Sequence, residues 1–182
     1  MVYFFVIMER LKIYNIDNDY IQYLSKYDLN IDYNVKETAK HIRPYAGILL
    51  SINDVNYFAP LKSPKKKFSK EMKSHVDIIL IENGKKGVIN LNDMIPIMKN
   101  NINLLNEVEY IVKSNDTDED IKYKNIIQDQ IAWCNKIENK TMIFKKAKRL
   151  YYLYDKLPDD NKLKKRCCNY KLLEEKAKEY KN

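Results

Sequence analysis

The residues best suited to chemistry in this sequence gather in one short stretch, Tyr57–Lys66. The stretch begins with strand-forming residues and continues into Lys62, Ser63 and Lys65, so a strand would deliver two ammonium groups and a hydroxyl to one place. Pro64 favours an extended turn there. Crowded ammonium groups lose a proton more easily than an isolated one, which suits phosphate binding and proton transfer. The other interpretation of these residues alone is a solvated basic turn.

Metal-binding patterns are sparse in this chain. The two histidines, His41 and His75, are far apart in sequence, and no CxxC, HExxH or paired-carboxylate pattern accompanies them. We therefore expect neither a metal nor a cofactor. A nuclease without a metal must cut RNA through the substrate's own 2′-OH, a nucleophile that DNA lacks. Side chains near the phosphate then move a proton and stabilise the charge that builds on it.

Side chains that could bind RNA lie on both sides of this stretch. Aromatic rings can stack on unpaired bases, and among the fifteen tyrosines Tyr33 and Tyr45 are favoured because they lie near the basic region. Tyrosines at helical spacing, such as Tyr20 and Tyr23, instead predict packing. Ser63 as a covalent nucleophile is not favoured, since neither GxSxG nor SxxK surrounds it. The candidates for RNA binding are Lys36, His41, Arg43, Tyr45, Lys66 and Lys67.

Composition is consistent with a polyanionic partner. The chain has 182 residues, with 33 Lys and Arg against 25 Asp and Glu, a formal charge of +8. A coding sequence rich in A and T would also produce this abundance of Lys, Asn, Ile and Tyr. The motif GxxxxGK[ST] is absent, which argues against a nucleotide-binding P-loop. Three cysteines, two of them adjacent, indicate reduced thiols and a cytoplasmic location.

The elements that would position these residues form one predicted domain over 1–182. The patterns predict a strand at 11–14, a helix over 20–27, a hairpin over 45–61 with its turn at Asn53-Asp54, and strands at 76–81 and 87–91. Helices are predicted at 102–112, 120–136, 141–154 and 170–180, with a capping segment at 115–120 and a polar loop at 162–168. Strands followed by helices indicate an α+β fold. Residues 1–8 are apolar but too short to span a membrane, and we interpret them as a possible N-terminal extension.

Several separated segments resemble one family, the ToxN/AbiQ toxins of type III toxin–antitoxin systems. They are, in order, Leu11–Tyr14 with Tyr20–Leu24, Arg43–Leu50, Tyr57–Lys66, Gly87–Ile97 and Cys168–Lys176, and Tyr57–Lys66 is the most specific. The resemblance extends from about Leu11 to the C-terminus and is nearest to the AbiQ branch.

The resemblance implies a fold, an activity and a partner. The fold would be a twisted antiparallel sheet flanked by helices, similar to the MazF/Kid core. The activity would be sequence-selective RNA cleavage that leaves 2′,3′-cyclic phosphate and 5′-OH ends, in the service of phage abortive infection. The partner would be a repeated pseudoknot RNA antitoxin, which the toxin cuts into units and then binds in its own active-site groove.

The resemblance also implies which residues catalyse the reaction. Ser63 and Lys65 match the catalytic Ser and Lys of the family motif, and Arg43 occupies a position where a relative has Lys. Lys62 departs from the Thr that a relative has there, and Tyr33 matches the family's catalytic Tyr in a loop of different length. The implied catalytic set is Ser63, Lys65, Lys62 and Tyr33. Two other classes remain open on sequence alone: an RNA-binding module without turnover, and a small basic interaction protein.

Overall fold

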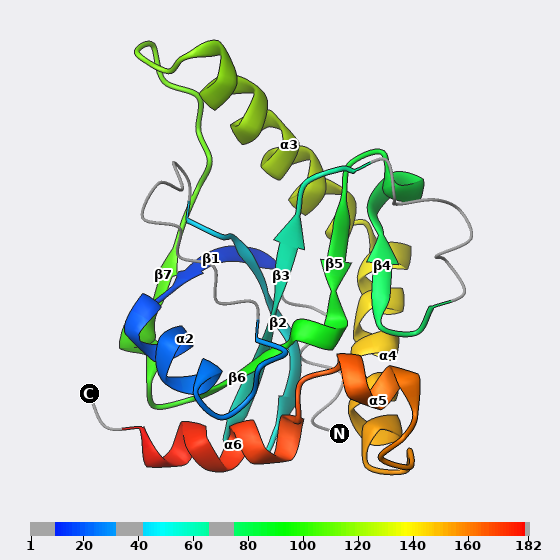
Figure 1. Ribbon diagram of the computed structural model, residues 1–182. Coiled ribbons are helices and arrows are strands. Elements are labelled where there is room, and N and C mark those ends of the chain that lie inside the picture. The colour runs from blue at the N-terminus through cyan, green and yellow to red at the C-terminus, as the bar shows by residue number, and fades with distance from the viewer. Residues whose placement is uncertain (1–9, 32–41, 66–74, 181–182) are drawn as a thin grey trace.

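The computed structural model describes residues 10–31, 42–65 and 75–180, and within them the strands form one antiparallel sheet (Figure 1). Its hydrogen-bonded order is β4-β5-β3-β2-β1-β7, and β6 pairs with β3 beside this path. The strands are β1 (Lys12–Ile16), β2 (Tyr45–Ile52), β3 (Val55–Lys62), β4 (Ile78–Leu80), β5 (Val88–Asn90), β6 (Ile95–Met98) and β7 (Leu105–Glu107). This confirms the predicted α+β class; likeness to MazF/Kid stays a prediction.

The hairpin of β2 and β3 forms the middle of the sheet, as the sequence predicts. Its turn is at Asn53, whose φ of 51° lies in the left-handed region that asparagine tolerates better than most residues. The register runs from Ile52 opposite Val55 to Tyr45 opposite Pro60. The N-terminal end of β2 and the C-terminal end of β3 therefore lie side by side.

Four of the five α-helices in the described residues begin at a residue whose side chain caps them, and the exception begins after Lys136. In α2 (Asn18–Ser25) the Asp17 side chain accepts from the backbone N–H of Tyr20 at 2.9 Å. In α3 (Asp118–Cys134) Thr117 and Asp120 form a reciprocal capping box, which confirms the predicted capping role of the acidic segment. The other helices are α4 (Ile137–Tyr154), α5 (Lys162–Arg166) and α6 (Tyr170–Glu179), with short 3₁₀ turns η2 (Ile81–Gly84), η3 (Leu91–Asp93) and η4 (Ile102–Leu104).

Two predicted elements were wrong. The helix expected over 102–112 is instead η4 followed by β7, because residues 105–107 pair with β1, with Ile16 opposite Leu105. The segment 162–168, expected as a polar loop, forms α5, and the two cysteines after it, Cys167 and Cys168, are 1% and 0% exposed. Lys, Leu and Arg favour a helix, and the side chain of Asn161 caps its first turn, so the polar character of 162–166 does not indicate a loop.

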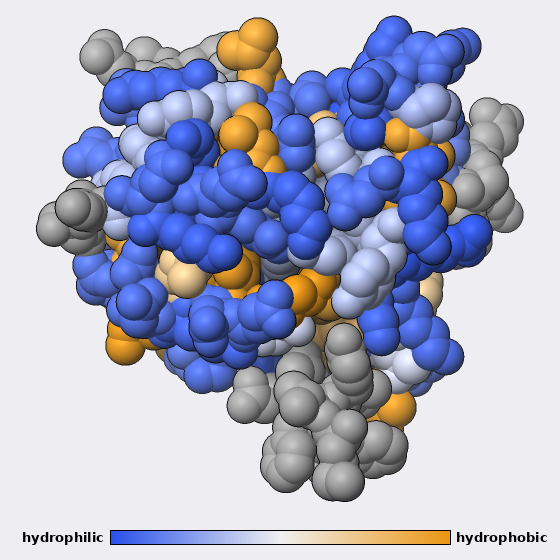
Figure 2. All heavy atoms as spheres, turned by 90° about the horizontal axis from the view of Figure 1, so that it is seen from below, coloured by the Kyte–Doolittle hydropathy of each residue, from blue (hydrophilic) through white to orange (hydrophobic). Residues whose placement is uncertain are grey.

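The C-terminal helix is bound to the sheet through a partly buried polar cluster. Glu174 of α6 accepts hydrogen bonds from the hydroxyls of Tyr57 in β3 and Tyr151 in α4, each at 2.7 Å. Figure 1 shows α6 crossing the lower end of the sheet with α2 beside it, and Tyr180 packs its ring on Tyr20 at 5.0 Å between centroids. Seen from below, the surface is largely hydrophilic with apolar atoms in its hollows (Figure 2). The core therefore lies between the sheet and these helices.

Candidate active site

The candidate site is at the end of β3, where the chain leaves the sheet. The last residues of the strand pair with β5, Leu61 opposite Ile89 and Lys62 opposite Val88. Beyond them Ser63, Pro64 and Lys65 are exposed and have no regular structure. Pro64 has no N–H to donate to a ladder, which favours the end of the strand here. Ser63 and Lys65 thus lie exposed directly beyond the end of β3, a strand that is paired on both sides within the sheet.

Lys62 is held more firmly than the residues after it. Its ammonium lies 3.0 Å from Oδ2 of Asp93, a residue in η3 that is only 7% exposed. The amide of Asn90 donates to the same oxygen at 3.0 Å, and Asn92 donates to the other carboxylate oxygen. A buried carboxylate needs such compensation, because an unpaired charge is costly away from water. Lys62 therefore contributes a fixed positive charge at the strand end.

The backbone of Lys62 is also held. Its carbonyl accepts a hydrogen bond from Nε2 of Gln130 in α3 at 3.2 Å, and the same nitrogen donates to the carbonyl of Lys86 at 2.6 Å. Gln130 is fully buried. The strand end is thus bound to both α3 and the turn before β5.

Arg43 and Tyr45 lie beside the end of β3, and they differ in their exposure to solvent. The backbone N–H of Leu61 donates to the carbonyl of Pro44 at 2.9 Å, which brings the start of β2 against the end of β3. Arg43 is half-buried beside this contact. Tyr45 is 3% exposed and packs in the core, an environment that argues against stacking of its ring on a base. Contact between Tyr45 and RNA stays a prediction.

Five of the predicted residues lie outside the described ranges. They are Tyr33, Lys36, His41, Lys66 and Lys67. The described chain resumes at Ile42, just before β2, and stops at Lys65, just after β3. Ile42 and Lys65 therefore adjoin the same end of the paired strands β2 and β3.

The three cysteine thiols are buried, and burial disfavours their reactive thiolate form. Burial raises the pKa of Cys134 and of Cys167 to about 12, and it raises the pKa of Cys168 well above its ordinary value. All three cysteines are free. They act as small apolar core residues.

Two features are absent from residues 10–31, 42–65 and 75–180: a cluster of metal-ligating side chains and a membrane-spanning helix. Within these ranges no group of three or more His, Cys, Asp or Glu side chains is arranged to hold a metal ion. Over the same ranges no helix combines the length and apolar character needed to cross a bilayer. The prediction that the reaction needs no metal stays a prediction.

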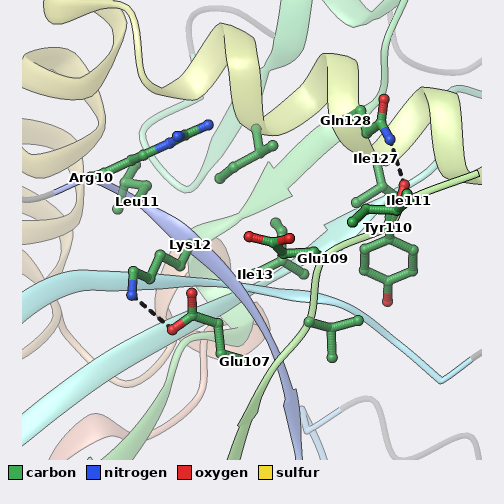
Figure 3. A pocket seen from close by; sticks show the side chains of 12 residues that line it. Arg10, Leu11, Lys12, Ile13, Glu107, Glu109, Tyr110, Ile111, Ile127 and Gln128 are labelled. Carbon is green, nitrogen blue, oxygen red and sulfur yellow. Dashed lines mark hydrogen bonds and ion pairs between the residues drawn. The ribbon is translucent and has the colours of Figure 1, made fainter.

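A separate cavity of about 440 Å³ lies between β1, the segment after β7 and α3 (Figure 3). Leu11, Ile13 and Ile127 contribute apolar walls, and an ion pair of 2.8 Å joins Lys12 to Glu107 at its side. Ser63 and Lys65 are not among the residues that line it. The cavity is therefore distinct from the strand-end site.

Comparison with known proteins decides the family. Residues 12–178 match the family model described as "Toxin ToxN, type III toxin-antitoxin system". The chain belongs to the ToxN toxin family. The prediction made from the separated motifs is thereby confirmed.

Two curated relatives and a solved structure are similar to this chain over nearly its whole length. Endoribonuclease ToxN of Bacillus thuringiensis subsp. kurstaki is 33% identical over 93% of this chain and 84% of its own length. Endoribonuclease AbiQ of Lactococcus lactis subsp. lactis is 32% identical over 93% and 89%. A solved chain from work on selective toxin inhibition by a non-coding RNA pseudoknot is 28% identical, with a TM-score of 0.72 and coverage of 94% and 98%.

Sequence reasoning missed Asp93 and Gln130, the two side chains that hold Lys62. Asp93 lies 31 residues from Lys62 and Gln130 lies 68 residues away, so no local pattern connects them. One signal was available for Gln130. It shares a helix face with Ile127 and Cys134, and a polar residue between two buried apolar ones indicates a specific buried hydrogen bond.

Proposed function

We propose that this ToxN-family chain is a metal-independent endoribonuclease, the toxin of a type III toxin–antitoxin system that acts in phage defence. One observation carries the proposal: the family match spans 12–178 and includes the motif at which Ser63 and Lys65 lie exposed beyond the end of β3, where Leu61 contacts Pro44, the neighbour of Arg43. Its relatives are named endoribonucleases. The site of action would be the cytoplasm.

The proposed reaction uses the nucleophile that RNA itself supplies. The 2′-oxygen attacks the adjacent phosphorus, the bond from phosphorus to the 5′-oxygen breaks, and a 2′,3′-cyclic phosphate and a 5′-OH result. The proton of the 2′-OH passes to a basic group and the leaving oxygen gains one. Lys65 and Arg43 would stabilise the charge on the phosphorane, and the Ser63 hydroxyl would donate to a non-bridging oxygen. Tyr33 is the further candidate for proton transfer.

Lys62 has a supporting role in this proposal. Its ammonium is bound to Asp93, so it adds positive potential beside the phosphate instead of transferring a proton. A lysine held in this way differs from the threonine that a relative has at this position.

The proposed inhibitor is an RNA. One structural relative comes from work on toxin inhibition by a non-coding RNA pseudoknot, and another, 26% identical with a TM-score of 0.73, from work on a processed non-coding RNA that regulates an antiviral system. For this chain we propose a repeated pseudoknot antitoxin that is cut into units and then bound in the same site, giving a protein–RNA assembly. The formal charge of +8 suits such a partner.

The test is RNA cleavage in excess EDTA. Purified protein is incubated with total bacterial RNA, and the new ends are mapped and analysed for cyclic phosphate and 5′-OH. Discrete cleavage with these ends is the expected result, with Ser63→Ala as the inactive control. A strict magnesium requirement would overturn the metal-independent mechanism. Binding without cleavage would favour the RNA-binding module instead.

A further inference from the structure

Gln130 connects three elements through one buried amide. It lies on α3 and is fully buried, and its Nε2 donates to the carbonyls of Lys62 and Lys86 at 3.2 and 2.6 Å. Lys62 ends β3 and Lys86 belongs to the turn before β5. Both hydrogens of the amide nitrogen are therefore used on backbone carbonyls.

The acceptor half of the same side chain is unused. Within the described residues, Oε1 of Gln130 is buried and has no hydrogen-bond partner. A buried acceptor without a partner is unfavourable, and an apolar side chain of similar shape would avoid that penalty. It would also leave the carbonyls of Lys62 and Lys86 without this donor. The two donated bonds are what this residue type provides.

A second feature converges on the same carbonyl. Gly87, next to Lys86, has a φ of +103°, and a Cβ built on it would lie 2.0 Å from the carbonyl oxygen of Lys62 and 2.7 Å from Nε2 of Gln130. Only glycine permits both this backbone conformation and this close approach. The carbonyl of Lys62 is therefore enclosed on one side by backbone and reached on another by the amide of Gln130.

The orientation of this carbonyl determines where Ser63 lies. The peptide unit is planar, so the carbonyl of Lys62 and the N–H and Cα of Ser63 share one plane. Fixing the oxygen fixes the direction in which the chain leaves the sheet. The ion pair between the ammonium of Lys62 and Asp93 further restrains this residue.

We propose that Gln130 is a positioning residue for RNA cleavage: it orients the Lys62–Ser63 peptide so that Ser63 and Lys65 are placed against the scissile phosphate. The proposal rests on the proposed function, since it assigns the reaction to the end of β3. Gln130 itself is buried and touches no substrate. Its loss should therefore lower the rate of the chemical step and leave RNA affinity unchanged.

The experiment compares Gln130→Met with Gln128→Met. Methionine fills a similar volume without donors. Gln128 is an exposed residue of the same helix whose amide also donates to a backbone carbonyl, that of Tyr110, at the separate cavity (Figure 3). Single-turnover cleavage is measured at saturating concentrations of a short synthetic RNA that spans one mapped cut site. Affinity is measured with the same RNA carrying a 2′-O-methyl group at that site, which removes the nucleophile.

The expected result is a rate about 10–100 times lower for Gln130→Met, with Kd within about threefold of wild type, because small displacements of catalytic groups carry losses of this order. Gln128→Met should cleave at the wild-type rate. A wild-type rate for Gln130→Met, or equal losses of rate and affinity, would overturn the proposal. If Gln130→Met fails to fold, Gln130→Asn, whose shorter amide does not reach both carbonyls, takes its place. Failure of both to fold would make Gln130 structural and would also overturn it.

Ser63→Ala is measured in parallel to separate the two proposals. An inactive Ser63→Ala beside a fully active Gln130→Met refutes the positioning role alone. A fully active Ser63→Ala refutes the site assignment on which the positioning role depends.

Discussion

Replacing Lys62 by methionine should destabilise the protein by about 3 kcal/mol, because it leaves a buried carboxylate without its cation. The ammonium of Lys62 lies 3.0 Å from Asp93, and the two side chains are 24% and 8% exposed. Removing one partner of a buried pair costs about 3–5 kcal/mol. We expect the lower end of this range, since the amide of Asn90 still donates to the same oxygen at 3.0 Å and the lysine retains some exposure to water.

The assay is urea unfolding followed by circular dichroism, with Lys86→Met as the matched control. Lys86 forms an ion pair with Asp129 in which the side chains are 37% and 52% exposed, and exposed pairs contribute little to stability. The control should therefore unfold close to wild type. The double variant Lys62→Met/Asp93→Asn should regain most of the lost stability, because the remaining amide carries no charge. A single Lys62→Met variant as stable as wild type would refute the reasoning.

Three further predictions concern the site, the RNA and the thiols. Ser63→Ala and Lys65→Ala should each lower cleavage by about 10²–10³ and change stability by no more than about 0.5 kcal/mol, because both side chains are exposed; full cleavage by either variant, measured beside its melting curve, would remove that residue from the site. RNA affinity should fall steeply between low and moderate salt, measured by fluorescence anisotropy, as counterions are displaced by lysine–phosphate contacts; a flat dependence would argue against an extended basic surface. Burial raises the pKa of the Cys134 and Cys167 thiols to about 12, so at pH 8 they should be protonated and shielded from solvent. Iodoacetamide should therefore label them slowly in the native protein and quickly in urea. Rapid labelling of the native protein would contradict their burial.

The elements predicted well from sequence are those determined by neighbouring residues. The hairpin over 45–61 has strand formers on both sides of Asn53, a residue that tolerates a positive φ. The helix start at Thr117 has its reciprocal partner three residues on, at Asp120. Local chemistry is sufficient in both cases.

The failed helix over 102–112 shows the limit of that approach. Its apolar residues suit helical spacing, yet residues 105–107 pair with β1, about 90 residues earlier in the chain, where Asn15 lies opposite Asn106. The unpaired backbone groups of β1 bind this segment as a strand, and the periodicity of residues 102–112 carries no information about β1.

The candidate site divides in the same way. The exposed position of Ser63 and Lys65 beyond a strand end was predictable, because strand-forming residues, the basic residues and Pro64 are adjacent in sequence. Asp93 and Gln130 were not, because each reaches Lys62 only after the chain has folded. Only Gln130 carries a local signal, because it lies on a helix face between the apolar residues Ile127 and Cys134.

The structure also separates the residues that stabilise the end of β3 from those proposed to cut RNA. Lys62 is held at its carbonyl by Gln130 and at its ammonium by Asp93, whereas Ser63 and Lys65 are exposed. A substitution at Lys62 therefore changes both the stability of the strand end and the electrostatic potential at the site, so its effect on cleavage has two causes. A substitution at Ser63 or Lys65 removes one group from a strand end that stays folded. Rates measured on these two positions can accordingly be interpreted as chemistry, and rates measured on Lys62 only after its loss of stability is subtracted.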